Sequence, residues 1–411
     1  MSRNLFYVLP LPLSAPSIKA RLAGLSILRI PDGVSLEYAT VKKLLLSKIP
    51  LHSIVSPVYL FKQHIDPFNL KHGMSSLEFV SECSNQLTRT SDQDILISFA
   101  FRHMSVLNAM AIQNFYYDDF FERFNYVIDL KVALNTCAYF GNTRLKQITN
   151  LNQVAKDLGF KGDLSNQLNR TEALHFIYQH LLAQDPKIMA FLTKPRDKRL
   201  SLVVNNCYVY LEDKGLYVVK VLDVSADGRI VKVIKANSSE MVLDTINLDF
   251  APLVAPLTIL TKERQVEHKF DLNEVLKRLN EAKLTELSNK ADDWVIGERD
   301  LPFYKSFFKH LNAQEQQVFE RLSRHDLRTE TNISSIANNS TKFSAFVMCY
   351  INENFPGACF DAERKNYLDY CNEQLKRRSS SVVQECQMLF DNINDKDTQS
   401  LALLKRISSY F

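Results

Sequence analysis

Residues 354–368 read NFPGACFDAERKNYL, and this stretch organises the last third of the chain. Apolar residues recur three and four apart from Phe303 to Phe411, which is the period of amphipathic helices. Pro356 and Gly357 interrupt the period, because proline stops one helix and glycine permits the turn into the next. The sequence therefore predicts a C-terminal region made of helices, with a break at this point.

Upstream, residues 200–260 have a different pattern, in which apolar and polar residues alternate as in half-buried strands. The alternation is centred on Asp213-Lys214-Gly215 and Ala226-Asp227-Gly228, which are typical turns of β-hairpins. A small antiparallel β domain is therefore expected here. Residues 271–290 that follow are charged and helical in period.

The first 195 residues mix both patterns, and this indicates an α/β sandwich. β-Branched and large apolar residues favour strands at residues 4–8, 25–30 and 94–100. Apolar spacing of three and four favours helices at 74–87, 105–115, 130–139 and 171–182.

Composition limits the class of protein. The chain has 411 residues, of which 46% are hydrophobic and 23% charged, so it can bury a full core and divide into two to four domains. No run approaches the length that a membrane helix needs, and residues 1–16 lack a signal-peptide cleavage site, so a cytoplasmic protein without membrane contact is expected. The net charge of +4 is small, so any nucleic-acid surface must be a local patch.

Motifs for cofactors are missing from the sequence. The seven cysteines contain no Cys-x-x-Cys, which argues against a disulfide framework and a zinc site. The ten glycines form no Gly-x-Gly-x-x-Gly or phosphate loop, and the nine histidines form no His-Glu-x-x-His. We therefore expect no metal, no nucleotide and no other cofactor.

Short segments along nearly the whole chain resemble the exonuclease I family, a group of 3′→5′ exonucleases specific for single-stranded DNA. No single match is diagnostic, but they occur in the family's order. In the C-terminal region they are Asn354-Phe355-Pro356-Gly357, Ala362-Glu363, Tyr367-Leu368, Gln387-Met388-Leu389 and Ala402-Leu403-Leu404-Lys405. Nearer the start they are Leu5-Phe6-Tyr7, Asn114-Phe115-Tyr116 with Asp118, Asp129-Leu130 through Cys137, Pro186-Lys187 and Arg196-Asp197-Lys198.

The resemblance implies three domains. A ribonuclease H-like (exonuclease) α/β domain would occupy residues 1–197, a small SH3-like β domain with a helical extension residues 198–292, and a C-terminal α-helical domain residues 293–411.

The family's chemistry requires four acidic side chains that hold two divalent metal ions. At the positions that match the first motif, Asp-x-Glu, this chain has Val8 and Pro10. The second motif's Asp falls in the window His103-Met104-Ser105, with Met104 at its centre. The third motif is a His with an Asp five residues later, and Ser165 and Arg170 match these positions. The sequence therefore predicts a degenerate active site with no catalytic residue.

Other carboxylates could in principle replace the lost ones. Asp163, Glu172, Asp118, Asp119 and Glu82 are the candidates, and their spacing favours solvated helix ends and faces instead. Arg170 leaves two interpretations open. A guanidinium there would repel a metal and could hold a phosphate directly; alternatively, it pairs with Glu172 or Asp163 on a helix surface.

The remaining expectation is binding. The basic residues Lys194, Arg196, Lys198 and Arg199 lie at the junction of the first two domains, and with Arg170 they are the predicted nucleic-acid contacts, unless the run is only a solvated linker. Phe99, Phe101, Phe115, Tyr116 and Tyr117 could stack on bases, or they belong to the core. Members of the family also bind the tail of single-stranded-DNA-binding protein through Arg residues, and Asn135 stands at one such position.

Two functions fit these observations. The first is a catalytically inactive, exonuclease I-like protein that binds single-stranded DNA or DNA ends as a non-cutting subunit in repair or phage defence. The second is a protein-interaction scaffold that docks onto a partner nuclease, helicase or defence-complex subunit. Residual 3′→5′ exonuclease activity is a minor third possibility.

Overall fold

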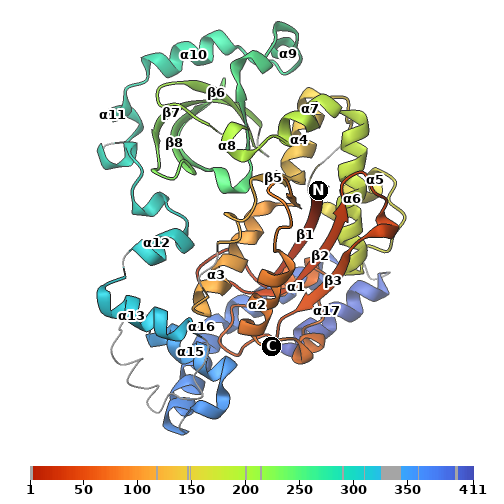
Figure 1. Ribbon diagram of the computed structural model, residues 1–411, viewed down its shortest axis with the longest axis vertical. Coiled ribbons are helices and arrows are strands. Elements are labelled where there is room, and N and C mark those ends of the chain that lie inside the picture. Colours follow the sequence, from red (N-terminus) through yellow and green to blue (C-terminus); the bar gives the residue numbers. More distant parts are fainter. Residues whose placement is uncertain are drawn as a thin grey trace.

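The computed structural model describes residues 3–116, 119–145, 148, 150–199, 201–212, 215–288, 291–309, 311–324, 344–359, 361–393 and 397–411 (Figure 1). Its described part contains two five-stranded sheets and many helices. The predicted residues Tyr117, Asp118, Asp213 and Lys214 lie outside the described ranges.

A mixed sheet forms the centre of the first region, with strand order β3-β2-β1-β4-β5. β1 is central, antiparallel to β2 and parallel to β4, and its residues are almost all buried because helices cover both faces. The predicted strands at 4–8, 25–30 and 94–100 are confirmed. The strands are β1 (Asn4–Pro12), β2 (Leu22–Pro31), β3 (Val41–Leu46), β4 (Ile95–Ser98) and β5 (Tyr126–Asp129).

Side chains of β1 alternate between two buried clusters, one on each face of the sheet. Phe6 and Val8 pack with residues of α2 and α3, whereas Tyr7, Leu9 and Leu11 pack with residues of α4, α5 and α6. The helices and 3-10 turns of this region are η1 (Leu36–Tyr38), α1 (Pro57–Lys62), η2 (Pro67–His72), α2 (Ser76–Gln86), η3 (Phe101–Met104), α3 (Ser105–Gln113), α4 (Leu130–Phe140), α5 (Leu151–Asp157), α6 (Gln167–Gln184), α7 (Pro186–Leu192) and α8 (Arg196–Arg199).

The second sheet is antiparallel, with order β10-β6-β7-β8-β9, and stands where the sequence predicts a β domain. Alternate residues of β7 and β8, among them Val219, Val221, Val231 and Val233, form a core of their own. Gly228, with φ of 69°, makes the turn between these strands. Likeness to SH3 domains stays a prediction. The elements are β6 (Cys207–Glu212), β7 (Gly215–Val224), β8 (Ile230–Ala236), β9 (Met241–Asn247), η4 (Leu248–Phe250), β10 (Leu253–Pro256) and η5 (Leu257–Ile259).

Helices follow the second sheet to the end of the chain, as predicted. α15 ends at Asn354, and Pro356 begins a 3-10 turn, so the expected break is present. None of the described helices combines the length and apolarity that crossing a membrane would take. The elements are α9 (Lys262–Glu267), α10 (Leu272–Glu281), α11 (Leu284–Leu287), η6 (Ala291–Trp294), η7 (Glu298–Asp300), α12 (Phe303–Lys309), α13 (Ala313–Leu322), α15 (Ser344–Asn354), η8 (Pro356–Ala358), α16 (Asp361–Asn392) and α17 (Thr398–Tyr410).

The end of α15 docks onto the beginning of α2, far away in sequence. The first amides of a helix have no partner within it, and here the C-terminal region supplies acceptors. Ser76 N donates to the Glu353 carboxylate over 3.0 Å, and Leu77 N donates to Asn354 Oδ1 over 3.1 Å. Asn354 Nδ2 also donates to Asn114 Oδ1 at 3.1 Å. Two segments that carry the resemblance, at 114–116 and 354–357, are therefore in direct contact.

A buried ion pair reinforces this contact. Arg21 Nη2 lies 3.2 Å from Glu353 Oε2, with the two side chains 3% and 7% exposed. Arg21 Nη2 also lies 3.0 Å from His52 Nε2, and His52 Nδ1 lies 3.0 Å from the Tyr367 hydroxyl. Burial and the Arg21 guanidinium hold the pKa of His52 well below its usual value, so the imidazole is neutral and Glu353 is the counter-ion of Arg21.

Replacing Glu353 with glutamine tests this contact. We expect Glu353→Gln to lower the free energy of unfolding by about 3–5 kcal/mol, because the buried Arg21 cation loses its counter-ion. The matched control is Glu373→Gln, which breaks an exposed ion pair with Arg377 and is expected to cost less than about 1 kcal/mol. Urea denaturation of both variants measures the difference. Equal losses would show that the Arg21 contact does not hold the two regions together.

Candidate nucleic-acid interface

The middle of β1 carries no ionisable side chain at the positions that match the family's metal ligands. Val8 is 0% exposed and pairs with Ile27 on β2 and Ser98 on β4. Pro10, also buried, points to the same face because residues two apart on a strand share a face. Val8 packs in one cluster with Phe101 and Met104, which are both 0% exposed. The structure thus brings the first and second motif positions together, within an apolar core.

The turn that carries Met104 is held by a carboxylate at the end of β5. Asp129 accepts hydrogen bonds from Ala100 N (3.1 Å), Phe101 N (2.7 Å) and Lys131 N (2.9 Å). Burial raises the pKa of Asp129, and these backbone donors oppose the rise. Its oxygens therefore cap η3 and α4, and they are not available to a metal.

The residues present do not fit the two divalent ions of the exonuclease I family. Hard cations require oxygen ligands, whereas Val8 and Met104 offer none. The carboxylates considered as replacements are engaged elsewhere: Glu82 pairs with Lys43 at 3.4 Å, and Glu172 pairs with Lys42. Asp163 and Asp119 accept hydrogen bonds from Ser165 and Asn108. Within the described ranges, no group of three or more His, Cys, Asp or Glu is placed to hold a metal.

Arg170 and Ser165 lie on the other side of the sheet, because α6 packs with Tyr7, Leu9 and Leu11. Both interpretations of Arg170 need correction. Its guanidinium is buried and donates to Asn152 Oδ1, Gln63 Oε1 and Gln167 Oε1 at 2.8–3.1 Å. Burial lowers the pKa of Arg170 to about 10. It neither pairs with Glu172 or Asp163 nor faces a ligand; it ties α6 to α1 and α5.

The residues of the predicted basic run at 194–199 differ in burial: some are exposed and one is buried. Lys194 and Lys198 are exposed, as a nucleic-acid contact requires. Arg196 is only 9% exposed, and its Nη2 donates to Phe121 O over 2.9 Å, so it serves the domain junction and not a ligand. For Arg199 the structure gives the helix position alone. The role of the two lysines stays a prediction.

Most of the predicted stacking residues belong to the core. Phe99, Phe101 and Phe115 are 8%, 0% and 0% exposed, so they cannot meet a base. Phe115 instead packs edge-to-face with Tyr350 of α15 at 5.1 Å. This corrects the stacking prediction and supports the alternative that the cluster is core.

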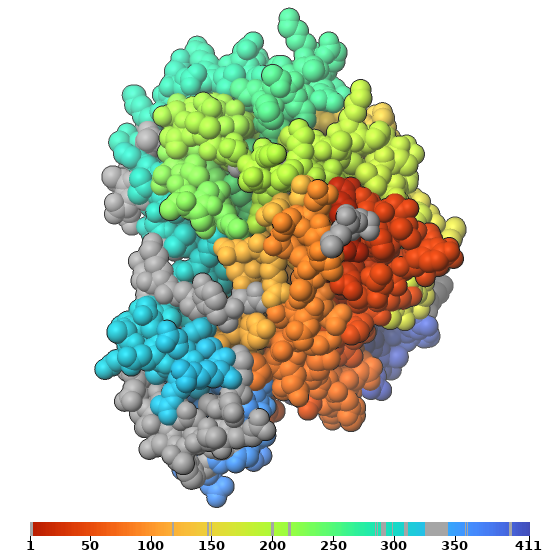
Figure 2. All heavy atoms as spheres, in the orientation of Figure 1, coloured from red at the N-terminus to blue at the C-terminus, as the bar shows by residue number. Residues whose placement is uncertain are grey.

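A cleft with different basic and aromatic residues lies where three regions of the chain meet. It has a volume of about 660 Å³ and begins beside Met104, since Arg102 and Ser105 line it. Figure 2 shows the second sheet (green) and the segment after it (cyan) beside this part of the first region (orange). The cleft is lined by Pro16, Arg102 and Ser105, by Lys232, Leu243, Asp244, Thr245, Asn247 and Phe250, and by Arg299, Asp300, Leu301, Pro302, Phe303 and Tyr304.

One buried carboxylate holds the walls of the cleft together. Asp249 is 0% exposed and lies 3.5 Å from Arg196 Nη1 and 3.1 Å from Arg229 Nη1. The Tyr304 hydroxyl donates to its other oxygen at 2.8 Å. Arg196 lies in α8, at the junction of the first region and the second sheet. Arg229 directly precedes β8 of the second sheet, and Tyr304 lies in α12. Asp249 is therefore shared by the junction, the second sheet and the segment after it. A buried charge is stable only with such partners.

Two further ion pairs line or adjoin the cleft. Lys232 Nζ lies 2.8 Å from Asp300 Oδ1, which joins β8 to η7. Lys305 Nζ lies 2.5 Å from Asp227 Oδ2, which joins α12 to the β7–β8 turn. Asp300 is paired with Lys232, and Arg299 Nη2 lies 3.3 Å from Asp293 Oδ1 at the exposed edge of the cleft. The exposed Arg102, for which the described ranges give no ion pair, adds a positive charge to the lining.

Sequence patterns alone do not single out Arg102, Arg299, Phe250 or Phe303. They lie far apart in the chain, and no local pattern joins them. A partial signal existed for Arg102, since it stands two residues before Met104, in the window of the second motif.

Comparison with solved structures identifies the fold. A product-bound exonuclease I superposes with a TM-score of 0.77 at 13% identity, covering 100% of this chain and 99% of that one. E. coli exonuclease I bound to a dA16 oligonucleotide gives 0.75 at 13% identity, with 99% of both chains covered. The chain has the exonuclease I fold. An exonuclease I from Methylocaldum szegediense matches at 0.74 and 16% identity, covering 99% of this chain and 98% of that one. No family model and no curated protein matches.

The exonuclease I fold confirms the expected α/β region followed by a helical C-terminal region. The predicted domain boundaries at 197/198 and 292/293 stay predictions.

The Lys305–Asp227 pair predicts a pH effect. Burial alone would raise the pKa of Asp227, but hydrogen bonds from Lys305 and Ser225 outweigh it and hold the pKa at about 2. The stabilisation is therefore present above the ordinary value of 3.8 and lost as the pH falls toward 2. We expect Lys305→Met to raise the pKa of Asp227 in a carboxyl NMR titration, and Lys277→Met on α10 to leave it unchanged. An unchanged value in Lys305→Met would contradict the pairing.

A second prediction concerns the apolar site on β1. Val8→Asp would place a carboxylate in the core and should lower the free energy of unfolding by about 3–5 kcal/mol at neutral pH. Because burial raises a carboxyl pKa, the loss relative to Val8→Asn should shrink as the pH falls toward 4. Urea unfolding at several pH values measures both variants. A pH-independent difference would show that position 8 is open to water.

Proposed function

We propose that this protein binds single-stranded DNA and holds it without cleaving it. The observation that carries the proposal is the cleft where three regions of the chain meet. Its lining includes arginine and phenylalanine side chains, while the positions that match the catalytic acids hold Val8, Pro10 and Met104. Solved structures of E. coli exonuclease I with the same fold are complexes with dA16 and dT13 oligonucleotides. That likeness supports a strand-binding role, and the apolar residues on β1 support the absence of cleavage.

The cleft offers what a single strand requires. Arginine binds phosphate with paired donors, and the cleft is lined by Arg102 on η3 and Arg299 on η7. Phe250 and Phe303 are half-buried at the cleft, and every base has a face that can stack on such rings. The site therefore suits a strand of any sequence. We assign the main phosphate contacts to Arg102 and Arg299, with Lys194 and Lys198 as outer contacts.

Binding of a fluorescently labelled oligonucleotide, titrated at several salt concentrations with Mg²⁺ present, tests the proposal. We expect salt-sensitive binding and an intact oligonucleotide on a denaturing gel. Each phosphate contact contributes about 0.7 to the slope of log K against log salt for a single strand. Arg102→Ala with Arg299→Ala should therefore lower affinity and reduce that slope by about 1.4.

The matched control removes the same charge elsewhere. Lys277→Ala with Arg377→Ala deletes two exposed cations on α10 and α16, and should leave affinity and slope nearly unchanged. A second pair, Lys194→Ala with Lys198→Ala, tests whether the two lysines at the junction before the second sheet contact the strand. If only the Lys194→Ala with Lys198→Ala variant reduces the slope of log K against log salt, the strand does not lie in the cleft. If the wild-type protein does not bind at low salt, strand binding is wrong; cleavage in Mg²⁺ would contradict the non-cutting role.

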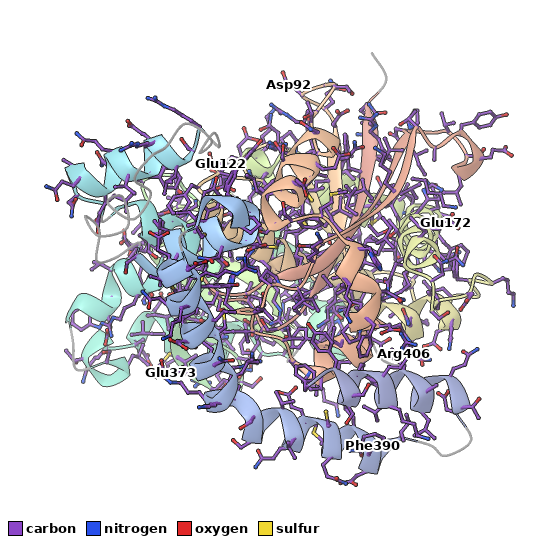
Figure 3. All side chains as sticks on the ribbon, turned by 90° about the horizontal axis from the view of Figure 1, so that it is seen from below. Asp92, Glu122, Glu172, Glu373, Phe390 and Arg406 are labelled. Carbon is purple, nitrogen blue, oxygen red and sulfur yellow. The ribbon has the colours of Figure 1, made fainter. Side chains whose placement is uncertain are left out.

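A second groove favours the alternative role as a protein-interaction scaffold. It has a volume of about 750 Å³ and lies between α16, α17 and the segment before α1. Figure 3 labels Phe390 on α16, which lines the groove, and Arg406 on α17. Leu375, Val383 and Phe411 line it and are 47%, 67% and 46% exposed, and its rim carries the exposed Lys376. This surface suits a partner segment with apolar and acidic side chains.

A further inference from the structure

We propose that the cleft holds the interior of a strand and requires no DNA end. This inference rests on the proposed function and deepens it, because it specifies which form of single-stranded DNA is bound. An enzyme that removes terminal nucleotides must bring the end of the strand to its metal ions. In this protein the residues that match the family's metal ligands do not fit metal ions. Their packing shows what occupies these positions.

The place of the terminal nucleotide is filled by the core. Val8, Phe101 and Met104 are each 0% exposed and pack in one cluster. Interiors of proteins are packed as densely as organic crystals, so a nucleotide cannot enter such a cluster without displacing it. Asp129 holds η3 over this cluster with hydrogen bonds to Ala100 and Phe101. The strand must therefore pass beside β1 and not end upon it.

The lining of the cleft recognises features that occur at every nucleotide. The side chains of Arg102 and Arg299 suit phosphates, and the rings of Phe250 and Phe303 suit base faces. Arg102 is exposed and lines the cleft, and within the described ranges no ion pair of its side chain is found. Recognition of an end needs contacts to a terminal hydroxyl in a closed site, whereas Val8, Phe101 and Met104 form an apolar, fully buried cluster. A strand without ends should satisfy all of these contacts.

Competition between a linear and a circular strand tests this inference. A labelled linear oligonucleotide is bound to the full chain, and unlabelled competitors of equal sequence and length are added: one linear, one linear with a 3′ phosphate, and one covalently closed circle. We expect the three competitors to act within about twofold of one another. Arg102→Ala with Arg299→Ala should weaken the linear and circular strands by the same factor, because both would use the same contacts.

The outcomes separate this inference from the proposed function. If linear strands bind and the circle competes about tenfold or more weakly, a difference of about 1.4 kcal/mol, the protein recognises an end and the inference is wrong, while strand binding stands. If a 3′ phosphate alone weakens the linear strand to that degree, the inference is also overturned, and the 3′ terminus is the recognised feature. If neither linear nor circular DNA binds, the proposed function and the inference both fail.

Discussion

The arrangement of the chain depends on one buried carboxylate, Asp249. Taking a charge out of water costs several kcal/mol unless charged partners and hydrogen bonds surround it. Asp249 obtains these partners from Arg196 at the junction, Arg229 of the second sheet and Tyr304 of α12. Any rotation of one part relative to another would leave a buried charge unpaired. The relative position of the three parts, and hence the width of the cleft, is set by this requirement.

The apolar packing in the middle of β1 is consistent with the proposed non-cutting role. β1 is the central strand, and a pair of acids on its buried face is unfavourable without metal ions to offset their charge. Val8 and Met104 remove that cost and extend the apolar cluster. Within the described ranges no group of His, Cys, Asp or Glu is placed to hold a metal, while Arg102 and Arg299 line the cleft that would contact a strand. A role in binding is consistent with both observations.

Much of the fold could be predicted from the sequence, because strand and helix periods are local properties. The β1 and β2 strands, α2 to α4 and the break at Pro356 were recognisable in this way. β3 was missed because Val41–Leu46 is only partly buried and carries two lysines, and β5 because four residues show little period. The candidate site was less predictable. Burial decided the roles of Arg170 and Arg196, and burial depends on neighbours such as Gln63 and Phe121 that are distant in sequence.

The last helix has a consequence for the order in which the protein folds. α17 packs on α1 and η2, and Tyr410 meets Phe68 edge-to-face at 5.7 Å. During synthesis, the N-terminal region emerges first, yet this part of its surface stays uncovered until α17 has left the ribosome. Apolar surface that stays exposed during synthesis can associate with other chains. The first region would thus pass through a stage in which its sheet is formed but the apolar surface of α1 and η2 is still exposed. Chaperones that bind nascent chains would be most needed at that stage.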